Sequence, residues 1–237
     1  MDQHKIVSRE AWVQARVALL EREKAFTRAR DALSMERRCL PWVEITKPYT
    51  FNTNEGEKAL ADLFGDHSQL VVYHFLYGPD WQTGCKSCSF WADNFDRNIA
   101  HLAARDVTLV AVSRAPLETL NAFRRRMDWS FDWVSSGGSD FNYDFDVSFT
   151  PEMREKGEIR YNYQASDFPV DDAPGISVFC KGEDAAIYHT YSTYGRGLDM
   201  LNAGYHYLDL VPKGRDEDGN QPMSWLKLRD SYAANGA

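Results

Sequence analysis

One pair of cysteines has a spacing that suits redox chemistry: Cys85 and Cys88, in the run Cys-Lys-Ser-Cys. Gly84 precedes the pair, and a segment with apolar residues at helical spacing follows it. At the N-terminus of such a helix, unpaired backbone N–H groups and the helix dipole lower the pKa of a thiol. Because the thiolate is the nucleophile, the pattern predicts that Cys85 attacks a disulfide and that Cys88, one turn later, resolves the mixed disulfide. Lys86 adds a positive charge beside Cys85.

Two other uses of the pair are open, a structural zinc site and two small buried apolar side chains. A closed zinc site needs four ligands, but Cys39 and Cys180 are single, and His74 and His189 lie in expected strands. Gly84 and the helix start behind it disfavour simple burial. We therefore expect no metal and no cofactor, and we expect Cys39 and Cys180 to be bystanders.

The pair lies within an alternating series of strands and helices. A near-continuous apolar run at 70–77 predicts a central strand buried on both faces, and a short turn leads from it to the cysteines. The other expected elements are strands at 42–46, 107–112, 131–134, 176–180 and 185–191, and helices at 8–36, 57–64, 89–104 and 117–127, with a final helix or turn at 198–205. Alternation predicts parallel strands with crossovers, and the last two strands form an antiparallel hairpin. The expected class is α/β, with a mixed central sheet and helices on both faces.

The length of 237 residues suits one main domain with extensions. We expect an N-terminal helical extension at 1–41, an α/β domain at 42–212 and a C-terminal tail at 213–237. An insertion at 137–175 is far longer than an ordinary connection, which indicates a functional loop, a lid or further elements. Within it, a small hairpin is expected around Lys156–Gly157.

The helix expected at 8–36 carries a narrow apolar stripe. Its members recur every seven residues: Trp12, Leu19, Phe26 and Leu33. The rest of the helix is largely charged, so the stripe predicts a docking seam. It would pack either on the body of the chain or on a second copy, as a homodimer.

Composition and charge exclude several classes of function. The 27 Lys and Arg against 35 Asp and Glu give a net charge of −8, which disfavours binding to nucleic acids and to anionic membrane surfaces. The first residues lack the apolar stretch of a secretory signal, and no run approaches the roughly 20 apolar residues of a membrane-spanning helix. We therefore expect a cytoplasmic protein.

Several residues near the pair could support its chemistry. Trp81 and Trp91 flank the cysteines and would form either an apolar collar or core anchors. Asp80 and Asp93 would either carry protons during exchange or remain solvated carboxylates. A further polar group follows the closing hairpin, where it would bind substrate or form a plain turn: His189, Tyr191, Tyr194 and Arg196.

The loop before the pair resembles the peroxiredoxin motif PxxxTxxC but is one residue short. With Pro79 and Thr83 in their places, the motif would put its cysteine at position 86, where the chain has Lys86. Pro79 and Thr83 are therefore expected to be loop residues. A thiol peroxidase, in which Cys85 is oxidised to sulfenic acid and Cys88 closes the disulfide, remains the first alternative.

Three long segments, in order, resemble a bacterial thioredoxin-like family known as domain of unknown function 899. They are QLVVYHFLYGPDW with GCKSCSFWADNF, then DFNYDF, then ISVFCKGEDAAIYHTYSTYGRGLDMLNAGYHYLDLVPKGRDE. The resemblance covers nearly the whole chain. It implies a thioredoxin-like three-layer fold and dithiol–disulfide oxidoreductase activity, with the family's CxxC at Cys85 and Cys88; it supplies no substrate. Lys86 stands where the family is expected to have proline.

A thioredoxin-like fold also implies a cis-proline opposite the cysteines, just before the strand that opens the closing hairpin. Pro174 is the candidate, since it precedes the strand expected at 176–180, and an ordinary trans loop proline is the alternative. A cis X–Pro bond costs only about 0.5–1 kcal/mol relative to trans, so it persists where it shapes a groove.

Together these observations predict a thiol–disulfide oxidoreductase acting on a protein or small-molecule disulfide, with an unidentified electron donor. Its nucleophile would be Cys85 and its resolving residue Cys88. The second alternative, after the peroxidase, is a non-catalytic binding protein that uses the acidic, aromatic segment 137–175 for recognition.

Overall fold

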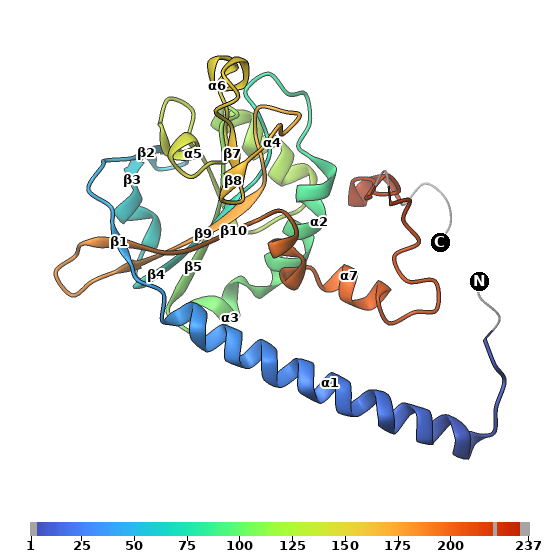
Figure 1. Ribbon diagram of the computed structural model, residues 1–237. Coiled ribbons are helices and arrows are strands. Elements are labelled where there is room, and N and C mark those ends of the chain that lie inside the picture. Colours follow the sequence, from blue (N-terminus) through green and yellow to red (C-terminus); the bar gives the residue numbers. More distant parts are fainter. Residues whose placement is uncertain (1–3, 220–221, 233–237) are drawn as a thin grey trace. The chain divides into compact units, whose positions relative to one another are not determined.

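The computed structural model describes residues 4–219 and 222–232 (Figure 1). The last five residues of the expected C-terminal tail, and its residues 220–221, lie outside the described residues. The chain divides into two compact units, 1–41 and 42–237. In the described part, no helix is long and apolar enough to cross a membrane.

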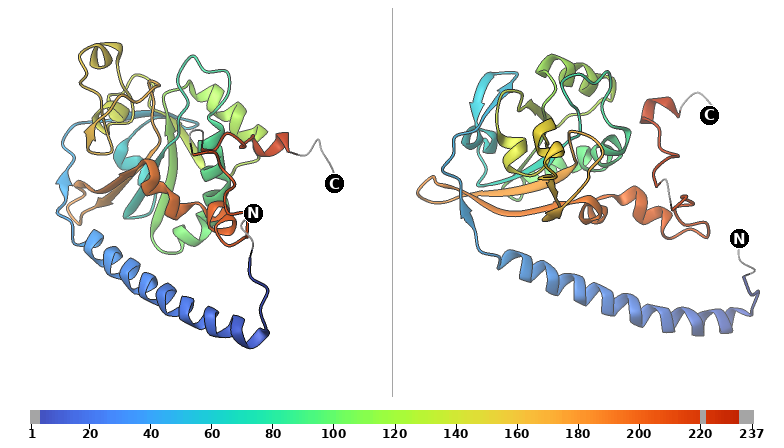
Figure 2. Two further views of the ribbon diagram at one scale, coloured as in Figure 1. Left: turned by 45° about the vertical axis from the view of Figure 1, so that its right-hand side comes forward. Right: turned by 45° about the horizontal axis from the view of Figure 1, so that its top comes forward.

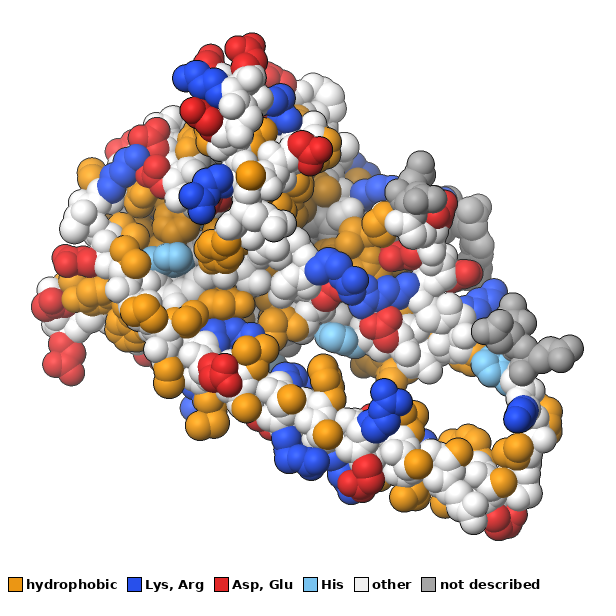
Figure 3. Space-filling model, in the orientation of Figure 1, with side chains coloured by type: hydrophobic (Ala, Val, Ile, Leu, Met, Phe, Trp, Pro, Cys, Tyr) orange, Lys and Arg blue, Asp and Glu red, His pale blue; other side chains and the backbone are white. Residues whose placement is uncertain are grey.

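The first unit is the helix α1, Arg9–Arg38. Ser8 caps it, with its hydroxyl accepting a hydrogen bond from the N–H of Ala11 at 3.2 Å, and Cys39 ends it. No residue of the helix is buried within this unit, and Figure 3 shows apolar side chains spaced along it among charged ones. The docking of the apolar stripe, on the body or on a second copy, stays a prediction.

The second unit is built on an eight-stranded mixed sheet with the order β1-β10-β9-β4-β5-β6-β2-β3. Its strands are β1 (Val43–Glu44), β2 (Thr50–Thr53), β3 (Gly56–Ala59), β4 (Gln69–His74), β5 (Val107–Ser113), β6 (Asp132–Ser135), β9 (Gly175–Lys181) and β10 (Ile187–Tyr194). The strands β4, β5 and β6 are parallel. In the β9–β10 hairpin, orange in Figure 2, β9 pairs antiparallel with β4, and β10 pairs antiparallel with β9.

Helices and short helical turns cover both faces of this sheet. The α-helices are α2 (Lys86–Phe95), α3 (Ile99–Ala103), α4 (Leu117–Arg126), α5 (Phe141–Asp144), α6 (Pro151–Glu155) and α7 (Ala203–Leu208). The 3₁₀ helices are η1 (Leu60–Phe64), η2 (Asp96–Asn98), η3 (Gly195–Leu201) and η4 (Arg229–Ser231).

Alternation along β4 shows how the layers form. Leu70 and Val72 are fully buried against η1 and α5 on one face, whereas Tyr73 is buried against α2, α4 and α7 on the other. Successive side chains of a strand point to opposite faces, so a strand between two helical layers is apolar throughout. The expected α/β class, with a mixed sheet in a three-layer thioredoxin-like arrangement, is confirmed.

Two expected helices were wrong in part. The helix expected at 57–64 is the strand β3 followed by η1, because Gly56, at φ +104°, turns the chain so that β3 pairs with β2. The helix expected at 89–104 begins earlier, at Lys86, and is broken at Asp96. The Asp96 carboxylate is buried and accepts hydrogen bonds from the backbone N–H and hydroxyl of Ser130, so this turn points inward.

The long insertion is ordered into small elements. It contains α5, α6 and a two-stranded ribbon of β7 (Arg160–Tyr161) and β8 (Gln164–Ala165). The hairpin expected at Lys156–Gly157 is wrong: Gly157, at φ +67°, ends α6, which is the usual place for a left-handed glycine. The ribbon turns instead at Asn162–Tyr163, both with positive φ.

A buried ion pair anchors the end of the insertion to the sheet. Arg114 follows β5 and binds Asp172 with two hydrogen bonds, Nε to Oδ1 at 2.6 Å and Nη2 to Oδ2 at 3.0 Å. The Ser148 hydroxyl donates to the same carboxylate at 2.5 Å, and the remaining Arg114 Nη1 donates to the hydroxyl of Tyr143. These bonds fix the chain two residues before Pro174.

The described part of the expected tail belongs to the second unit and packs on α2 and α4. Leu226 is buried, and the ring of Trp225 contacts that of Phe90 in α2. Arg126 of α4 pairs with Asp230 at 2.7 Å. The C-terminal segment therefore lies beside the helix that carries the cysteine pair.

Candidate active site

Cys85 and Cys88 lie where the sequence predicts, at the start of α2. Cys85 is the N-cap residue, with extended backbone dihedrals, and its carbonyl accepts hydrogen bonds from the N–H and hydroxyl of Ser89 at 3.0 and 2.8 Å. Its own N–H donates to the carbonyl of Leu76, just beyond β4. Cys85 is partly exposed, Cys88 is only 2% exposed, and both are free thiols.

The two thiols have opposite electrostatic environments. The pKa of Cys85 is lowered to about 6, first by the adjacent Cys88 thiol, which donates to the thiolate, and then by the N–H groups of Cys88 and Ser87. Burial opposes this shift. For Cys88, burial raises the pKa well above its usual value, and the neighbouring Cys85 raises it further. At neutral pH the partly exposed Cys85 is therefore mostly the thiolate, and the buried Cys88 keeps its proton.

A pocket of about 400 Å³ opens beside the two sulfurs. Three parts of the chain line it. The first is β4 with α2, the second is the insertion, and the third is η3 with the C-terminal segment. Their lining residues are Tyr73, Leu76, Cys85, Ser87, Cys88 and Trp91; Phe168, Val170 and Pro174; and Gly195, Arg196, Leu198, Asp199 and Met223.

Tyr161 holds two of these walls together. Its hydroxyl donates to the carbonyl of Pro174 at 2.7 Å and accepts from the N–H of Gly195 at 2.9 Å. Within the insertion, Arg154 also donates to the carbonyl of Phe168 at 2.7 Å. The insertion therefore consists of further ordered elements and forms one wall of the cysteine pocket.

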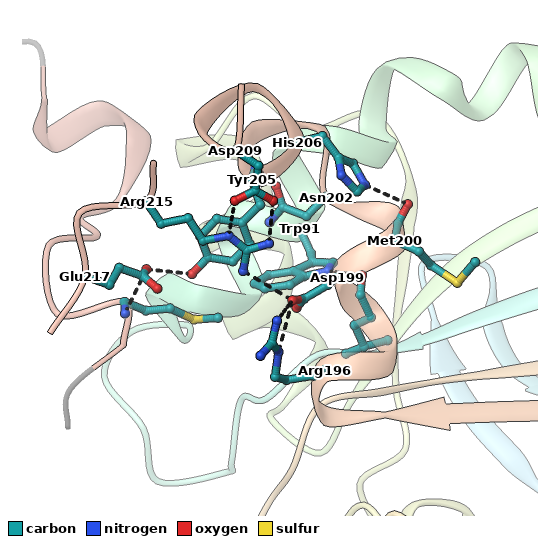
Figure 4. Close-up of polar contacts among 12 residues, drawn as sticks. Trp91, Arg196, Asp199, Met200, Asn202, Tyr205, His206, Asp209, Arg215 and Glu217 are labelled. Atoms are coloured by element: carbon teal, nitrogen blue, oxygen red, sulfur yellow. Dashed lines mark hydrogen bonds and ion pairs between the residues drawn. The ribbon is translucent and has the colours of Figure 1, made fainter. Parts of the chain in front are cut away.

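The third wall, formed by η3 and the C-terminal segment, is held in place by a hydrogen bond from α2. The indole N–H of Trp91 donates to the carbonyl of Leu198 at 2.8 Å, which binds η3 to the cysteine helix. Behind it, Arg196 and Arg215 both pair with the carboxylate of Asp199 at 3.2 Å, as Figure 4 shows. Arg215 makes a further ion pair with Asp209 at 2.8 Å.

The expected cis-proline is wrong, and the trans alternative holds. Pro174 does lie at the pocket, opposite the cysteines, but the peptide bond before it is trans. The chain is extended on both sides of this bond, since Asp172 forms a β-bridge with Ser148 and β9 begins at Gly175. The trans isomer, which X–Pro bonds prefer, fits this path without a turn.

Of the other expected site residues, some line the pocket and some do not. Trp91 and Arg196 line it, but Trp81, Lys86 and Asp80 do not. Trp81 is half-buried against the second core cluster, Asp80 is exposed, and the Lys86 amine donates to the carbonyl of Ser224 at 3.3 Å.

The remaining candidates have structural contacts away from the sulfurs. Asp93 accepts a hydrogen bond from the indole of Trp129 at 2.8 Å and is half-buried, which raises its pKa. His189 lies against the hydroxyl of Ser192, and the Tyr194 hydroxyl donates to the carbonyl of Phe145. None of them lines the cysteine pocket.

Sequence reasoning missed most of the pocket lining. Tyr73 lies under the pair, with its hydroxyl donating to the carbonyl of Cys88 at 3.3 Å. Phe168 and Val170 come from the insertion, whose length and aromatic residues, Phe168 among them, were the only sequence signals, and Met223 carries no sequence signal. Over residues 4–219 and 222–232, no cluster of three or more His, Cys, Asp or Glu is arranged to hold a metal ion.

The pKa of Cys85 makes its alkylation rate a direct test of the site. In a background with Cys39 and Cys180 replaced by serine, the iodoacetamide rate should follow the thiolate fraction, with a midpoint near pH 6 and a tenfold fall per pH unit well below it. Cys88→Ala removes the largest cause of the lowered pKa, so the midpoint should rise. Cys88→Ser, which keeps a hydroxyl donor, should shift it less. An unchanged midpoint in Cys88→Ala would show that the second thiol does not stabilise the thiolate.

Gly84 allows the loop before the pair to pack closely. A Cβ at this position would lie 2.8 Å from a ring carbon of Phe123 and 3.1 Å from one of Phe75. Gly84→Ala is therefore expected to lower the free energy of unfolding by about 1–3 kcal/mol, the usual cost of overpacking. Urea unfolding would measure it, with Gly219→Ala as control, because a Cβ there has no neighbour within 4 Å. Equal stability of the two variants would contradict the tight packing.

Among solved structures, the chain is similar to several peroxiredoxins. Peroxidoxin BcpB from Mycobacterium tuberculosis is 11% identical, covering 69% of this chain and 94% of that one, with a TM-score of 0.47. A cysteine mutant of Xylella fastidiosa PrxQ is 16% identical over 67% and 89%, with a TM-score of 0.42. The mitochondrial 2-Cys peroxiredoxin from Plasmodium falciparum is 10% identical over 69% and 92%, with a TM-score of 0.41. Similarity at this level indicates neither an activity nor a substrate.

No curated protein matches the sequence. One family model does, and it spans residues 1–232, which is nearly the whole chain. The family is described as a bacterial protein of unknown function, and the match confirms the resemblance seen in the three long segments. The chain therefore belongs to the DUF899 family of bacterial proteins of unknown function.

Proposed function

We propose that the chain is a thiol–disulfide oxidoreductase, with Cys85 as nucleophile and Cys88 as resolving residue. One observation carries this proposal: a partly exposed thiol with a pKa of about 6 lies at a helix N-terminus, one turn before a buried thiol that keeps its proton, at the edge of an open pocket. The dominant ionic form at neutral pH is thus the reactive one.

The reaction follows from these two protonation states. The Cys85 thiolate attacks one sulfur of a substrate disulfide, forming a mixed disulfide and releasing the other half as a thiolate, which takes a proton from water. Cys88 then gives up its proton and attacks the Cys85 sulfur, and the second half of the substrate leaves with that proton as a thiol. The protein loses two electrons and the proton of Cys88, water supplies the second proton, and the substrate becomes two thiols. A second dithiol must then reduce the protein for another turnover.

Each thiol suits its step. Attack needs a thiolate at working pH, which the lowered pKa of Cys85 supplies. Cys88 must not compete for substrate, and its burial and raised pKa keep it out of the first step. Formation of the mixed disulfide removes the negative charge of Cys85, which is one of the causes that raise the pKa of Cys88. The resolving thiol is therefore activated only after the first step.

A comparison of oxidants tests this proposal against the thiol peroxidase alternative. Reduced protein, in the background lacking Cys39 and Cys180, is mixed in a stopped-flow instrument with hydroxyethyl disulfide or with hydrogen peroxide, and acid-quenched samples are counted for free thiols. We expect loss of two thiols per chain with the disulfide, at a rate that follows the thiolate fraction of Cys85. Much faster oxidation by peroxide, with a sulfenic acid at Cys85 in Cys88→Ser, would instead establish the peroxidase. No reaction with either would leave the binding-protein alternative.

A further inference from the structure

The pocket beside Cys85 has a strongly apolar lining. Seven of its lining side chains are hydrophobic and belong to all three walls: Leu76, Trp91, Phe168, Val170, Pro174, Leu198 and Met223. Tyr73 adds apolar ring surface to the lining, because its hydroxyl donates a hydrogen bond to the carbonyl of Cys88. Ligands in such pockets are held mainly by burial of their own apolar surface.

Apart from the Cys85 thiolate, whose charge is lost when it attacks the substrate, the charged residues of the lining give no preference for a cationic or an anionic arm. They are Arg196 and Asp199, which pair with each other. Arg215 pairs with Asp199 and with Asp209, so two arginines and two aspartates form one network whose formal charges cancel (Figure 4). A charged substrate arm would lose its hydration on entering the pocket and would find only paired charges at the rim and apolar side chains inside. Its binding is therefore unfavourable.

The size and construction of the pocket favour a small molecule. A volume of about 400 Å³ lies at the lower end of the range for small-molecule sites. Its walls come from distant parts of the chain and are fixed to each other, by Tyr161 between Pro174 and Gly195 and by Trp91 to Leu198. The sulfur pair thus faces a bounded space that can hold one substrate arm.

We propose that the substrate is a low-molecular-weight disulfide whose transferred half carries an uncharged apolar arm, which this pocket holds while its sulfur is bonded to Cys85. This inference rests on the proposed function and adds the substrate class. The arm enters the pocket as Cys85 attacks its sulfur, and it leaves as the free thiol once Cys88 has closed the protein disulfide. Charged disulfides of similar size are the disfavoured substrates.

A homologous series of alkyl 2-pyridyl disulfides tests the proposal in single turnovers. Attack on the alkyl-bearing sulfur leaves the alkyl arm on Cys85 and releases pyridine-2-thione, which is followed by absorbance. The full chain lacking Cys39 and Cys180 is mixed with the methyl, butyl and carboxyethyl compounds, and each rate is divided by the rate with free N-acetylcysteine. Full burial of each added methylene should raise the normalised rate by about fourfold, which corresponds to about 0.8 kcal/mol per CH₂. The butyl arm should therefore exceed the methyl arm by up to about 60-fold, and should also exceed the carboxyethyl arm.

A variant of the pocket wall tests the location. Val170 is 38% exposed and lines the pocket, so Val170→Asp places a charge there with little risk to folding. It should bring the butyl rate near the methyl rate. The matched control is Val211→Asp, at an exposed valine that does not line the pocket, and it should keep the preference for butyl.

The results of these experiments distinguish a failure of the apolar substrate class from a failure of the proposed function. Equal normalised rates for all arms, a faster carboxyethyl arm, or an equal loss in Val211→Asp would overturn the apolar substrate class while leaving the exchange reaction in place. Release of pyridine-2-thione by Cys85→Ser at the rate of the unmodified pair would instead overturn the proposed function.

Discussion

Replacement of Cys85 by serine is expected to abolish thiol–disulfide exchange, reducing the rate to that of buffer. The hydroxyl of serine does not ionise at neutral pH, so the attacking anion is lost, while the helix start and the pocket remain. Cys88→Ser should behave differently. The first step should proceed, because Cys85 keeps its exposure and its position as N-cap, but the mixed disulfide should accumulate. Intact-mass spectrometry after addition of a small disulfide would measure the absence of an adduct in Cys85→Ser and its accumulation in Cys88→Ser.

The chain supplies its own controls for this pair of variants. The same change at Cys39, which ends α1, or at Cys180, in β9, should leave the rate unchanged, because neither residue lines the cysteine pocket. A stable adduct on Cys88 in Cys85→Ser, formed as fast as the adduct on Cys85 in the unmodified chain, would reverse the assignment of the two roles.

Loss of the Arg114 side chain is expected to give the largest change in stability. Arg114→Met keeps the length of the side chain but removes both hydrogen bonds from Arg114 to the buried Asp172 carboxylate. Of the bonds described above, that carboxylate then keeps only the one from the Ser148 hydroxyl. Removing one partner of a buried ion pair costs about 3–5 kcal/mol, and since Arg114 is partly exposed we expect about 3 kcal/mol. Because Asp172 lies two residues before Pro174, the same variant should loosen the insertion and lower the preference for apolar arms.

Urea unfolding of Arg114→Met and two comparison variants shows whether the buried ion pair causes the loss of stability. Arg126→Met breaks a pair of similar length with Asp230, but both side chains are well exposed, so it should cost less than about 1 kcal/mol. Arg114→Met combined with Asp172→Leu removes the orphaned charge and should recover part of the loss. Equal losses for the two single variants would mean that the buried pair stabilises the fold no more than a surface pair.

The local sequence was sufficient to predict the position of the chemistry. The apolar run of β4 and the glycine before Cys85 indicated a strand, a turn and a helix start, and all three were found. These features depend on neighbours in the chain, through side-chain periodicity and helix capping. The hairpin of β2 and β3 was missed because its pairing, with Gly56 at φ +104°, competes with an apparent helical pattern that local propensity cannot exclude.

The walls of the pocket could not be predicted, because they depend on long-range contacts. Met223 reaches the sulfurs only through packing of the C-terminal segment on α2, more than 100 residues away in the chain. Phe168 and Pro174 are placed by the Arg114–Asp172 pair and by Tyr161, none of which has a sequence signature. The bond before Pro174 is the trans isomer that X–Pro bonds prefer, and the cis expectation came from the fold resemblance and not from the residue.

A redox titration of the Cys85–Cys88 pair tests the proposed dithiol couple most directly. Protein is equilibrated across a series of dithiothreitol ratios, free thiols are alkylated in acid, and each cysteine is assigned by peptide mass spectrometry. We expect Cys85 and Cys88 to pass together, reversibly and with one midpoint, between two free thiols and one shared disulfide, while Cys39 and Cys180 stay reduced. Independent oxidation of the two residues, or a pair that never closes the disulfide at any ratio, would contradict the dithiol mechanism.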